Sequence, residues 1–141
     1  MTGFLMNKNL MKPKLSTQEK EKRRLKQSVK RAIERCFSQS KLSKQVKQNA
    51  YNPNKKGIRG GKTYICNNCK ESFGLGKIQI DHIVPKIPVD LSFHELDYNE
   101  LVKAIFCSIE NLQVLCKVCH TNKTLLETKT RKELRNRRKG L

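Results

Sequence analysis

Between residues 18 and 37 the large apolar side chains follow one helical period. They recur at every fourth position, namely at Leu25, Val29, Ile33 and Phe37. This spacing places them on one narrow stripe of a helix, and lysine and arginine cover most of the remaining surface. Ser16, with Glu19 three positions later, is typical of a capping box. The pattern therefore predicts a basic helix over residues 17–38.

The second half of the chain contains short apolar runs and amphipathic segments. Residues 77–84 alternate loosely and are rich in isoleucine, which predicts a strand that Pro85 ends. Residues 112–115 predict a second strand. Asp97 can cap a short helix between the two strands, and a last helix is expected over residues 117–135. The apolar contacts expected of these two helices are made by Leu101, Val102, Ile105, Leu125 and Leu126.

Turn-forming residues separate the basic helix from this apolar part. Residues 39–61 are rich in Gln, Ser, Asn and Lys and contain Pro53 and several glycines, which is typical of a linker. The N-terminal residues show no periodicity and predict disorder. The predicted division is a disordered basic tail (1–16), a basic helix (17–38), a flexible linker (39–61), a compact domain (62–135) and a basic C-terminal tail (136–141).

The composition limits the core and locates the charge. The 141 residues are 36% hydrophobic and include no tryptophan, so the core is small, and small domains often add a structural metal. The formal net charge is +19. Residues 1–60 hold 17 Lys and Arg against 3 acidic residues, residues 61–120 hold 6 against 7, and residues 121–141 hold 8 against 2. Basic flanks around a nearly neutral centre indicate a polyanionic partner.

The charge pattern favours nucleic acid over a membrane. The basic helix has few large apolar residues, and no apolar run reaches the roughly 18 residues of a membrane span. The first residues do not resemble a secretory signal, so we expect a cytoplasmic protein. The expected partner is DNA, with RNA as an open alternative. The candidate nucleic-acid-binding residues are Arg23, Arg24, Arg31, Arg59, Lys62 and Lys123.

Four of the six cysteines form two Cys-x-x-Cys pairs, Cys66 with Cys69 and Cys116 with Cys119. Two such pairs supply the four sulfurs that tetrahedral structural zinc prefers. The alternatives are a redox pair or disulfides, but two pairs in a cytoplasmic chain favour zinc. Four thiolates leave no open position on the ion, so this site is expected to stabilise the fold. The remaining cysteines, Cys36 and Cys107, are expected to be buried packing residues.

Asp81, His82 and His120 have no role in the zinc site. Asp81 and His82 lie near the end of a predicted strand, and His120 directly follows a zinc ligand at the start of a helix. The three side chains are therefore expected to converge. Adjacent strand residues point to opposite faces, so Asp81 and His82 share a site only if the strand twists or ends there. A carboxylate suits Mg²⁺ or Mn²⁺, and an imidazole suits Mn²⁺, Ni²⁺ or Zn²⁺.

Together, these residues resemble the zinc-containing HNH endonuclease motif. The resemblance covers about residues 62–125 and rests on both Cys-x-x-Cys pairs and on the segments Asp81-His82-Ile83-x-Pro85 and Asn111-Leu112-x-x-Leu115-Cys116-x-x-Cys119-His120-x-x-Lys123. It implies that Asp81 and His120 bind a catalytic divalent ion and that His82 is the general base. It further implies that Asn111 braces the loop between the strands and that Lys123 meets a phosphate. The implied fold is α+β, a ββα-metal finger with a four-cysteine zinc site and a basic N-terminal helical arm.

The resemblance implies a metal-dependent endonuclease that hydrolyses phosphodiester bonds in DNA by nicking or double-strand cleavage. Its expected cofactors are structural Zn²⁺ and catalytic Mg²⁺ or Mn²⁺, with Ni²⁺ or Zn²⁺ as further candidates. The chain is similar to phage or mobile-element nucleases, such as homing endonucleases, which would act in the host cytoplasm as a monomer or homodimer. Two alternatives stay open: a non-catalytic zinc-dependent nucleic-acid-binding module, and a phage packaging or assembly factor. His94 has no motif partner, and no role is expected of it.

Overall fold

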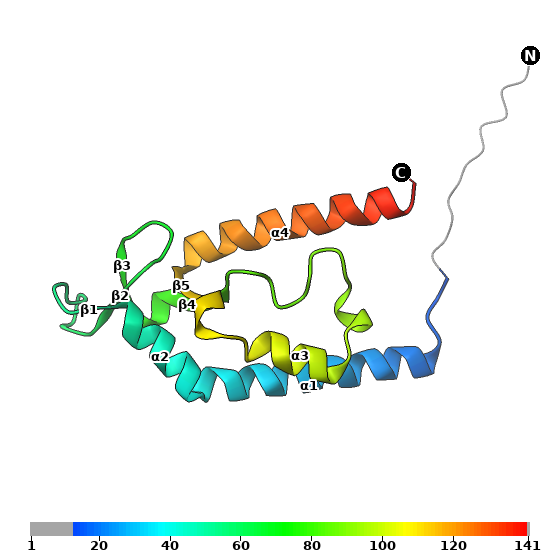
Figure 1. The fold of residues 1–141 in the computed structure, drawn as a ribbon, viewed down its shortest axis with the longest axis horizontal. Helices are drawn as coiled ribbons and strands as arrows, with labels where there is room; N and C mark the ends of the chain where they lie inside the picture. Colours follow the sequence, from blue (N-terminus) through cyan, green and yellow to red (C-terminus); the bar gives the residue numbers. More distant parts are fainter. Residues whose placement is uncertain (1–12, 141) are drawn as a thin grey trace, which may run out of the picture.

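The computed structural model describes residues 13–140, which form an α+β fold with two small antiparallel sheets (Figure 1). The helices of this part of the chain are α1 (Thr17–Gln39), α2 (Lys41–Ala50), α3 (Tyr98–Ile105) and α4 (Lys117–Arg138). Its strands are β1 (Tyr51–Asn52), β2 (Thr63–Ile65), β3 (Ser72–Gly74), β4 (Ile78–His82) and β5 (Leu112–Cys116). The predicted order of strand, short helix, strand and long helix is confirmed by β4, α3, β5 and α4. Most of the predicted N-terminal tail lies outside the described residues.

Helix α1 begins where its capping box predicts. The Ser16 hydroxyl accepts the Glu19 N–H, and the Glu19 carboxylate accepts the Ser16 N–H. Only the C-terminal part of the apolar stripe reaches the core, where Phe37 is buried and Ile33 packs against it. Leu25 is 61% exposed, so its predicted packing is wrong. The N-terminal half of α1 extends away from the core (Figure 1).

The prediction of a flexible linker over residues 39–61 is wrong for its first half, which forms α2. The Ser40 side chain caps this helix by accepting the Ser43 N–H. Ser43 and Val46 are buried, and α2 packs against both sheets. The turn-forming residues lie further along, in the loop between β1 and β2.

The main core surrounds the β4–β5 ladder, in which Ile80 pairs with Val114 and His82 with Leu112. Asp97 caps α3 as predicted, and Leu101 and Ile105 of α3 are almost fully buried. The predicted inward position of Val102 is wrong, because this side chain is 41% exposed on the outer face of α3. The buried core side chains are Phe37, Val46, Ile78, Leu101, Ile105, Leu112 and Val114.

A second sheet, β1–β2–β3, carries the first pair of cysteines. Cys66 follows β2 directly, and the turn to β3 contains Cys69 and Lys70, whose φ of 62° lies in the left-handed region. The Cys66 N–H donates to the Glu71 carbonyl, and the Asn67 N–H donates to the Val114 carbonyl of β5. This turn is therefore hydrogen-bonded to the β4–β5 sheet, which brings the first cysteine pair to the second.

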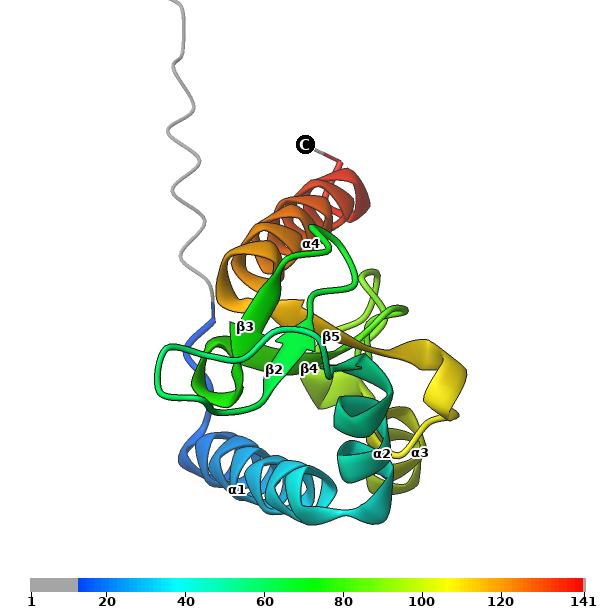
Figure 2. The same ribbon diagram turned by 90° about the vertical axis from the view of Figure 1, so that its left-hand side faces the viewer.

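Helix α4 runs along one side of the molecule and α1 along the other, with the segment after β4 between them (Figures 1 and 2). Only the start of α4 packs on the sheet, so Leu125 and Leu126 are 63% and 66% exposed and their predicted burial is wrong. The helix continues to Arg138, which corrects the predicted tail over residues 136–141. Among the described helices, none is long and apolar enough to cross a membrane.

The two remaining cysteines differ from each other. Cys36 is exposed on α1, so its predicted burial is wrong, because it lies outside the stripe that contains Phe37. Cys107 is partly buried and packs against the core, which agrees with the prediction.

Candidate functional site

The two Cys-x-x-Cys pairs form one cluster. Their four sulfur atoms all lie within 4.8 Å of one another. Cys66 and Cys116 are buried, Cys119 is partly buried and Cys69 is exposed. Cys116 is also the N-cap of α4, where its sulfur accepts the Cys119 N–H at 3.4 Å. Four sulfurs on a tetrahedral ion are spaced by about 4 Å, so these cysteines are positioned to hold a metal ion.

The surroundings of the sulfurs favour one anionic thiolate and oppose others beside it. Burial raises the pKa of the Cys66 thiol, but backbone N–H groups that donate to its sulfur lower that pKa to about 6. The Glu71 N–H lowers the pKa of Cys69, but burial and the neighbouring sulfurs raise it to about 11. Four negative sulfurs at this distance repel one another, so a bound cation is needed to stabilise them together.

Asp81 lies on the face of β4 that α4 covers. Its side chain is 11% exposed. The Oδ2 atom accepts from Gln113 Nε2, directly across the ladder, and lies 2.9 Å from Lys123 Nζ. The Oδ1 atom lies 3.8 Å from His120 Nε2. The structure thus brings Asp81 and His120 together, as predicted.

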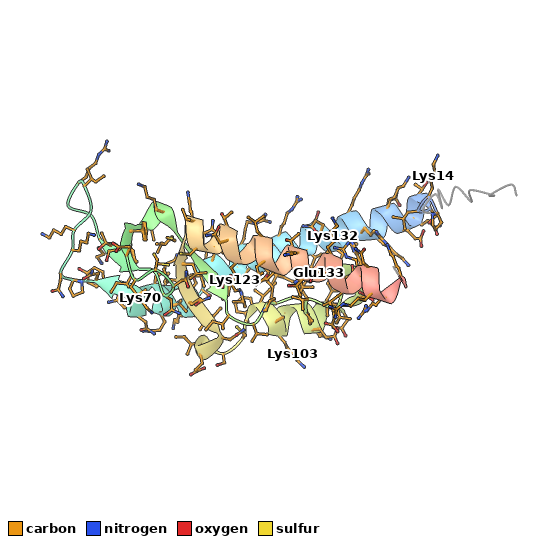
Figure 3. All side chains as sticks on the ribbon, turned by 90° about the horizontal axis from the view of Figure 1, so that it is seen from above. Lys14, Lys70, Lys103, Lys123, Lys132 and Glu133 are labelled. Atoms are coloured by element: carbon orange, nitrogen blue, oxygen red, sulfur yellow. The ribbon has the colours of Figure 1, made fainter. Side chains whose placement is uncertain are left out.

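Lys123 is the central cation of this region. Its ammonium nitrogen lies 2.9 Å from Asp81 Oδ2, 2.8 Å from Glu127 Oε1 and 2.6 Å from the carbonyl oxygen of His82. Burial lowers the pKa of Lys123, but the two carboxylates outweigh it, and the net pKa lies above its usual value. In Figure 3, which views the molecule from the α4 side, Lys123 lies over the body of the molecule, whereas Lys70 and Lys103 lie toward its edges.

The His82 side chain lies on the opposite face of β4 from Asp81, as expected for adjacent strand residues. Its Nε2 atom lies 3.0 Å from the carbonyl oxygen of Ile105, and its ring packs 5.7 Å from the Phe37 ring. A carbonyl oxygen only accepts, so Nε2 carries the hydrogen and Nδ1 is the basic nitrogen of the neutral ring. Burial lowers the pKa of His82 below its usual value, and the nearby Lys86 lowers it further. The imidazole is therefore neutral near pH 7.

Asn111 fixes the backbone that follows His82. Its side-chain oxygen accepts the Val84 N–H at 2.8 Å, and its side-chain nitrogen donates to the Val84 carbonyl at 3.3 Å. The Ile83 N–H donates to the Asn111 carbonyl at 2.8 Å. These contacts join the two ends of the segment that connects β4 to β5. The motif resemblance implies that Asn111 braces this segment.

A hollow of about 200 Å³ lies between β4, α4 and the segment after β4. Arg131 of α4 closes one side of it and donates to the Pro88 carbonyl at 2.8 Å. The residues that line the hollow are Ile80, Asp81, His82, Pro85, Lys86, Ile87, His120, Lys123, Thr124, Glu127 and Arg131. Asp81, His82 and His120 therefore share one hollow, although the His82 imidazole is bonded on the far face of its strand.

The other predicted binding residues lie elsewhere. Arg23, Arg24 and Arg31 are exposed on α1, and Arg59 and Lys62 are exposed on the β1–β2 loop. None of these five residues lines the hollow. His94, of which no role was expected, is exposed on the segment between β4 and α3. The prediction missed two residues that contact the Asp81–Lys123 pair. Gln113 donates to Asp81, and Glu127 forms an ion pair with Lys123. The position of Glu127 four residues after Lys123 was the available signal.

Comparisons of the chain with protein-family models, with curated proteins and with solved structures gave no match.

Proposed function

We propose that the chain is a metal-dependent HNH-type endonuclease that hydrolyses phosphodiester bonds in DNA. One observation carries the proposal: a carboxylate and an imidazole from facing elements, Asp81 and His120, lie 3.8 Å apart in a hollow that His82 also lines. Zinc in the four-thiolate cluster would fix the start of α4 and with it the position of His120. The β4, β5 and α4 elements then correspond to the ββα-metal finger that the motif implies.

The donor atoms of the hollow suit a divalent ion. Two atoms bound to one ion at about 2.1 Å lie at most about 4.2 Å apart, and Asp81 Oδ1 and His120 Nε2 satisfy this limit at 3.8 Å. One oxygen and one nitrogen donor suit Mn²⁺ better than Mg²⁺. Asp81 Oδ2 is already held by Gln113 and Lys123, so Oδ1 is the oxygen that would bind. When bound, such an ion polarises the scissile phosphate and stabilises the departing 3′ oxygen.

The residues of the chain have distinct roles in this proposal. His82 is the proposed base, and Nδ1 is the nitrogen that would accept the proton from the attacking water. Because the Ile105 carbonyl holds the ring on the other face of β4, this role requires the ring to turn toward the hollow. Asn111 holds the backbone after His82 in place. Lys123 and Arg131, which line the hollow, attract the DNA phosphate. The exposed arginines of α1 hold the duplex backbone, so binding weakens strongly as salt rises.

A plasmid-cleavage assay tests the proposal. Supercoiled plasmid is incubated with the zinc-loaded protein and Mg²⁺, Mn²⁺, Ni²⁺ or Zn²⁺ in turn. The proposal predicts ion-dependent nicks or breaks, and it predicts that His82→Ala lowers the rate by about 10²–10⁴-fold. His94→Ala, which changes an exposed histidine of the neighbouring segment, is the matched control and should cleave normally. Equal cleavage by His82→Ala and wild type would exclude His82 as the base.

A non-catalytic nucleic-acid-binding module is the second candidate function, and Lys123 supports it. Its ammonium already neutralises the buried Asp81 carboxylate, so the hollow satisfies its own charges. The cleavage assay separates the two candidates. A purely binding module retards plasmid in a gel without nicking it in the presence of any of the four ions.

A further inference from the structure

The loop between β1 and β2, residues 53–62, has no role in the proposed catalytic site. It projects at the end of the molecule away from the C-terminus (Figure 1). Strand β2 leads from this loop straight into Cys66. The loop is therefore connected to the cysteine cluster by one short strand.

Hydrogen bonds give this loop a defined shape. The Gly57 N–H donates to the Gly61 carbonyl at 2.8 Å, and the Gly60 N–H donates to the Gly57 carbonyl at 2.9 Å. Gly60 has a φ of +74°, a conformation that glycine adopts without strain. At the base of the loop the buried Thr63 hydroxyl donates to the Lys55 carbonyl at 2.6 Å. The tip is thus a closed turn on a paired base.

The tip is narrow and presents one apolar side chain. Ile58 is fully exposed, at 102% of its reference surface, so it contributes nothing to the core. In the sequence, Gly57 precedes Ile58, and Gly60 and Gly61 follow Arg59. Ile58 and Arg59 are therefore the only side chains beyond a hydrogen in residues 57–61, and the backbone of the tip can approach a partner closely.

The loop is also strongly basic. Residues 53–62 contain no acidic residue. Their four cations are all exposed, namely Lys55, Lys56, Arg59 and Lys62. Such a surface complements the phosphate backbone of a duplex. A protein partner for one apolar side chain would require a larger apolar patch around Ile58, and the flanking glycines and cations provide none.

We propose that residues 53–62 enter the minor groove of duplex DNA, with Ile58 as a wedge between base steps and Arg59 in the narrowed groove. The minor groove of B-DNA is about 6 Å wide and admits slim elements. Apolar wedges with neighbouring Arg or Lys are a known means of binding and kinking it. The choice of DNA as the duplex rests on the proposed function. The loop would then position the hollow on the backbone beside the bound groove.

Binding of an end-labelled duplex DNA of about two helical turns to the full-length, zinc-loaded protein tests the proposal, with no further divalent ion added. Fluorescence anisotropy gives the Kd over a salt series, and energy transfer between the duplex ends reports bending. Ile58→Ser removes the wedge, and Val102→Ser changes another exposed apolar residue, on α3. Gly61→Leu widens the tip without changing charge, and Gly76→Leu is its control, since neither glycine has a neighbour within 4 Å of an added Cβ.

We expect Ile58→Ser to raise the Kd about tenfold, the effect of exposing one isoleucine side chain, and to abolish bending. Gly61→Leu should raise the Kd similarly, although it keeps every charge. Arg59→Gln should lower the salt slope by about 1. Val102→Ser and Gly76→Leu should bind as wild type does. A double-stranded RNA of the same sequence, whose minor groove is wide and shallow, should not respond to Gly61→Leu.

Unchanged Kd and bending in Ile58→Ser and Gly61→Leu would overturn the proposal, and so would an equal loss on double-stranded RNA or a wild-type protein that does not bind the duplex. Cleavage is scored separately in the plasmid assay. A protein that cleaves but does not respond to the loop variants contradicts only this inference. One that responds to them but never cleaves contradicts only the nuclease assignment.

Discussion

The cysteine cluster and the Asp81 hollow share one helix start, yet they balance charge in opposite ways. Cys119 and His120 are consecutive residues of α4, one in each site. In the cluster, four sulfur atoms lie within 4.8 Å of one another. In the hollow, Lys123 already lies 2.9 Å from Asp81 and 2.8 Å from Glu127. The cluster therefore depends on a metal ion for its charge balance, whereas the hollow is balanced by its own side chains and a metal must compete for it.

Loss of a cysteine ligand should have the largest effect on this comparison. Cys66→Ser removes a fully buried ligand, and structural zinc supplies about 10–16 kcal/mol of apparent binding free energy in small domains. This is as large as a typical total folding free energy of about 5–15 kcal/mol. We expect the variant to lose bound zinc and its cooperative melting transition, measured by metal analysis and circular dichroism.

Cys36→Ser is the matched control, because Cys36 is exposed on α1 and takes no part in the cluster. It should melt at the wild-type temperature and keep its zinc. A Cys66→Ser protein that melts like Cys36→Ser would show that the cluster does not stabilise the fold.

Asn111→Ala should have an intermediate effect. It should alter the backbone beside His82 and leave the cysteine cluster intact. It removes the two hydrogen bonds to Val84, at about 1 kcal/mol each, and frees the backbone beside His82. We expect the free energy of unfolding to fall by about 1–2 kcal/mol and cleavage to fall by about 10–100-fold at full zinc occupancy. Denaturant titration and the plasmid assay measure the two effects.

Asn136→Ala, an exposed position on α4, is its control and should change neither quantity. If cleavage by Asn111→Ala falls no further than its loss of folded protein explains, Asn111 stabilises the loop without positioning His82.

Replacement of Lys123 should have the smallest effect, and it should strengthen metal binding rather than weaken a property of the protein. The Lys123 ammonium competes with a divalent ion for the Asp81 carboxylate, and a partly exposed ion pair contributes up to about 1 kcal/mol. Lys123→Met should therefore bind Mn²⁺ about fivefold more tightly in a calorimetric titration. Lys129→Met, an exposed lysine of the same helix, should leave the affinity unchanged. Weaker Mn²⁺ binding by Lys123→Met would show that Lys123 assists the ion.

The cysteine cluster and the Asp81 hollow also differ in how far the sequence could predict them. The Cys-x-x-Cys spacing predicts a metal site from chemistry alone, and the structure brings those four residues together as expected. The pairing of Asp81 with Gln113 depends on the register of β4 against β5. The contact of Lys123 with Asp81 depends on the direction in which α4 leaves the sheet. Neither can be obtained from a local pattern.

The wrong predictions about the fold also show what a local sequence pattern leaves out. Helix α2 was missed because glycines and Pro53 dominate residues 39–61 as a whole, although Leu42, Val46 and Ala50 recur at every fourth position after the capping Ser40. The exposure of Leu125 follows from a helix that touches the sheet only at its start. Periodicity identifies an apolar face, but only the tertiary arrangement determines how much of it is covered.

The central claim is that Asp81 binds a catalytic ion distinct from the metal of the cysteine cluster. Zinc and manganese stoichiometry, measured together with plasmid cleavage for Asp81→Asn, tests it most directly. The exposed Asp90→Asn is the control. The account predicts that Asp81→Asn keeps one zinc per chain, loses Mn²⁺ binding and does not cleave, whereas Asp90→Asn behaves as wild type in all three. An Asp81→Asn protein that binds Mn²⁺ and cleaves like wild type would contradict the claim.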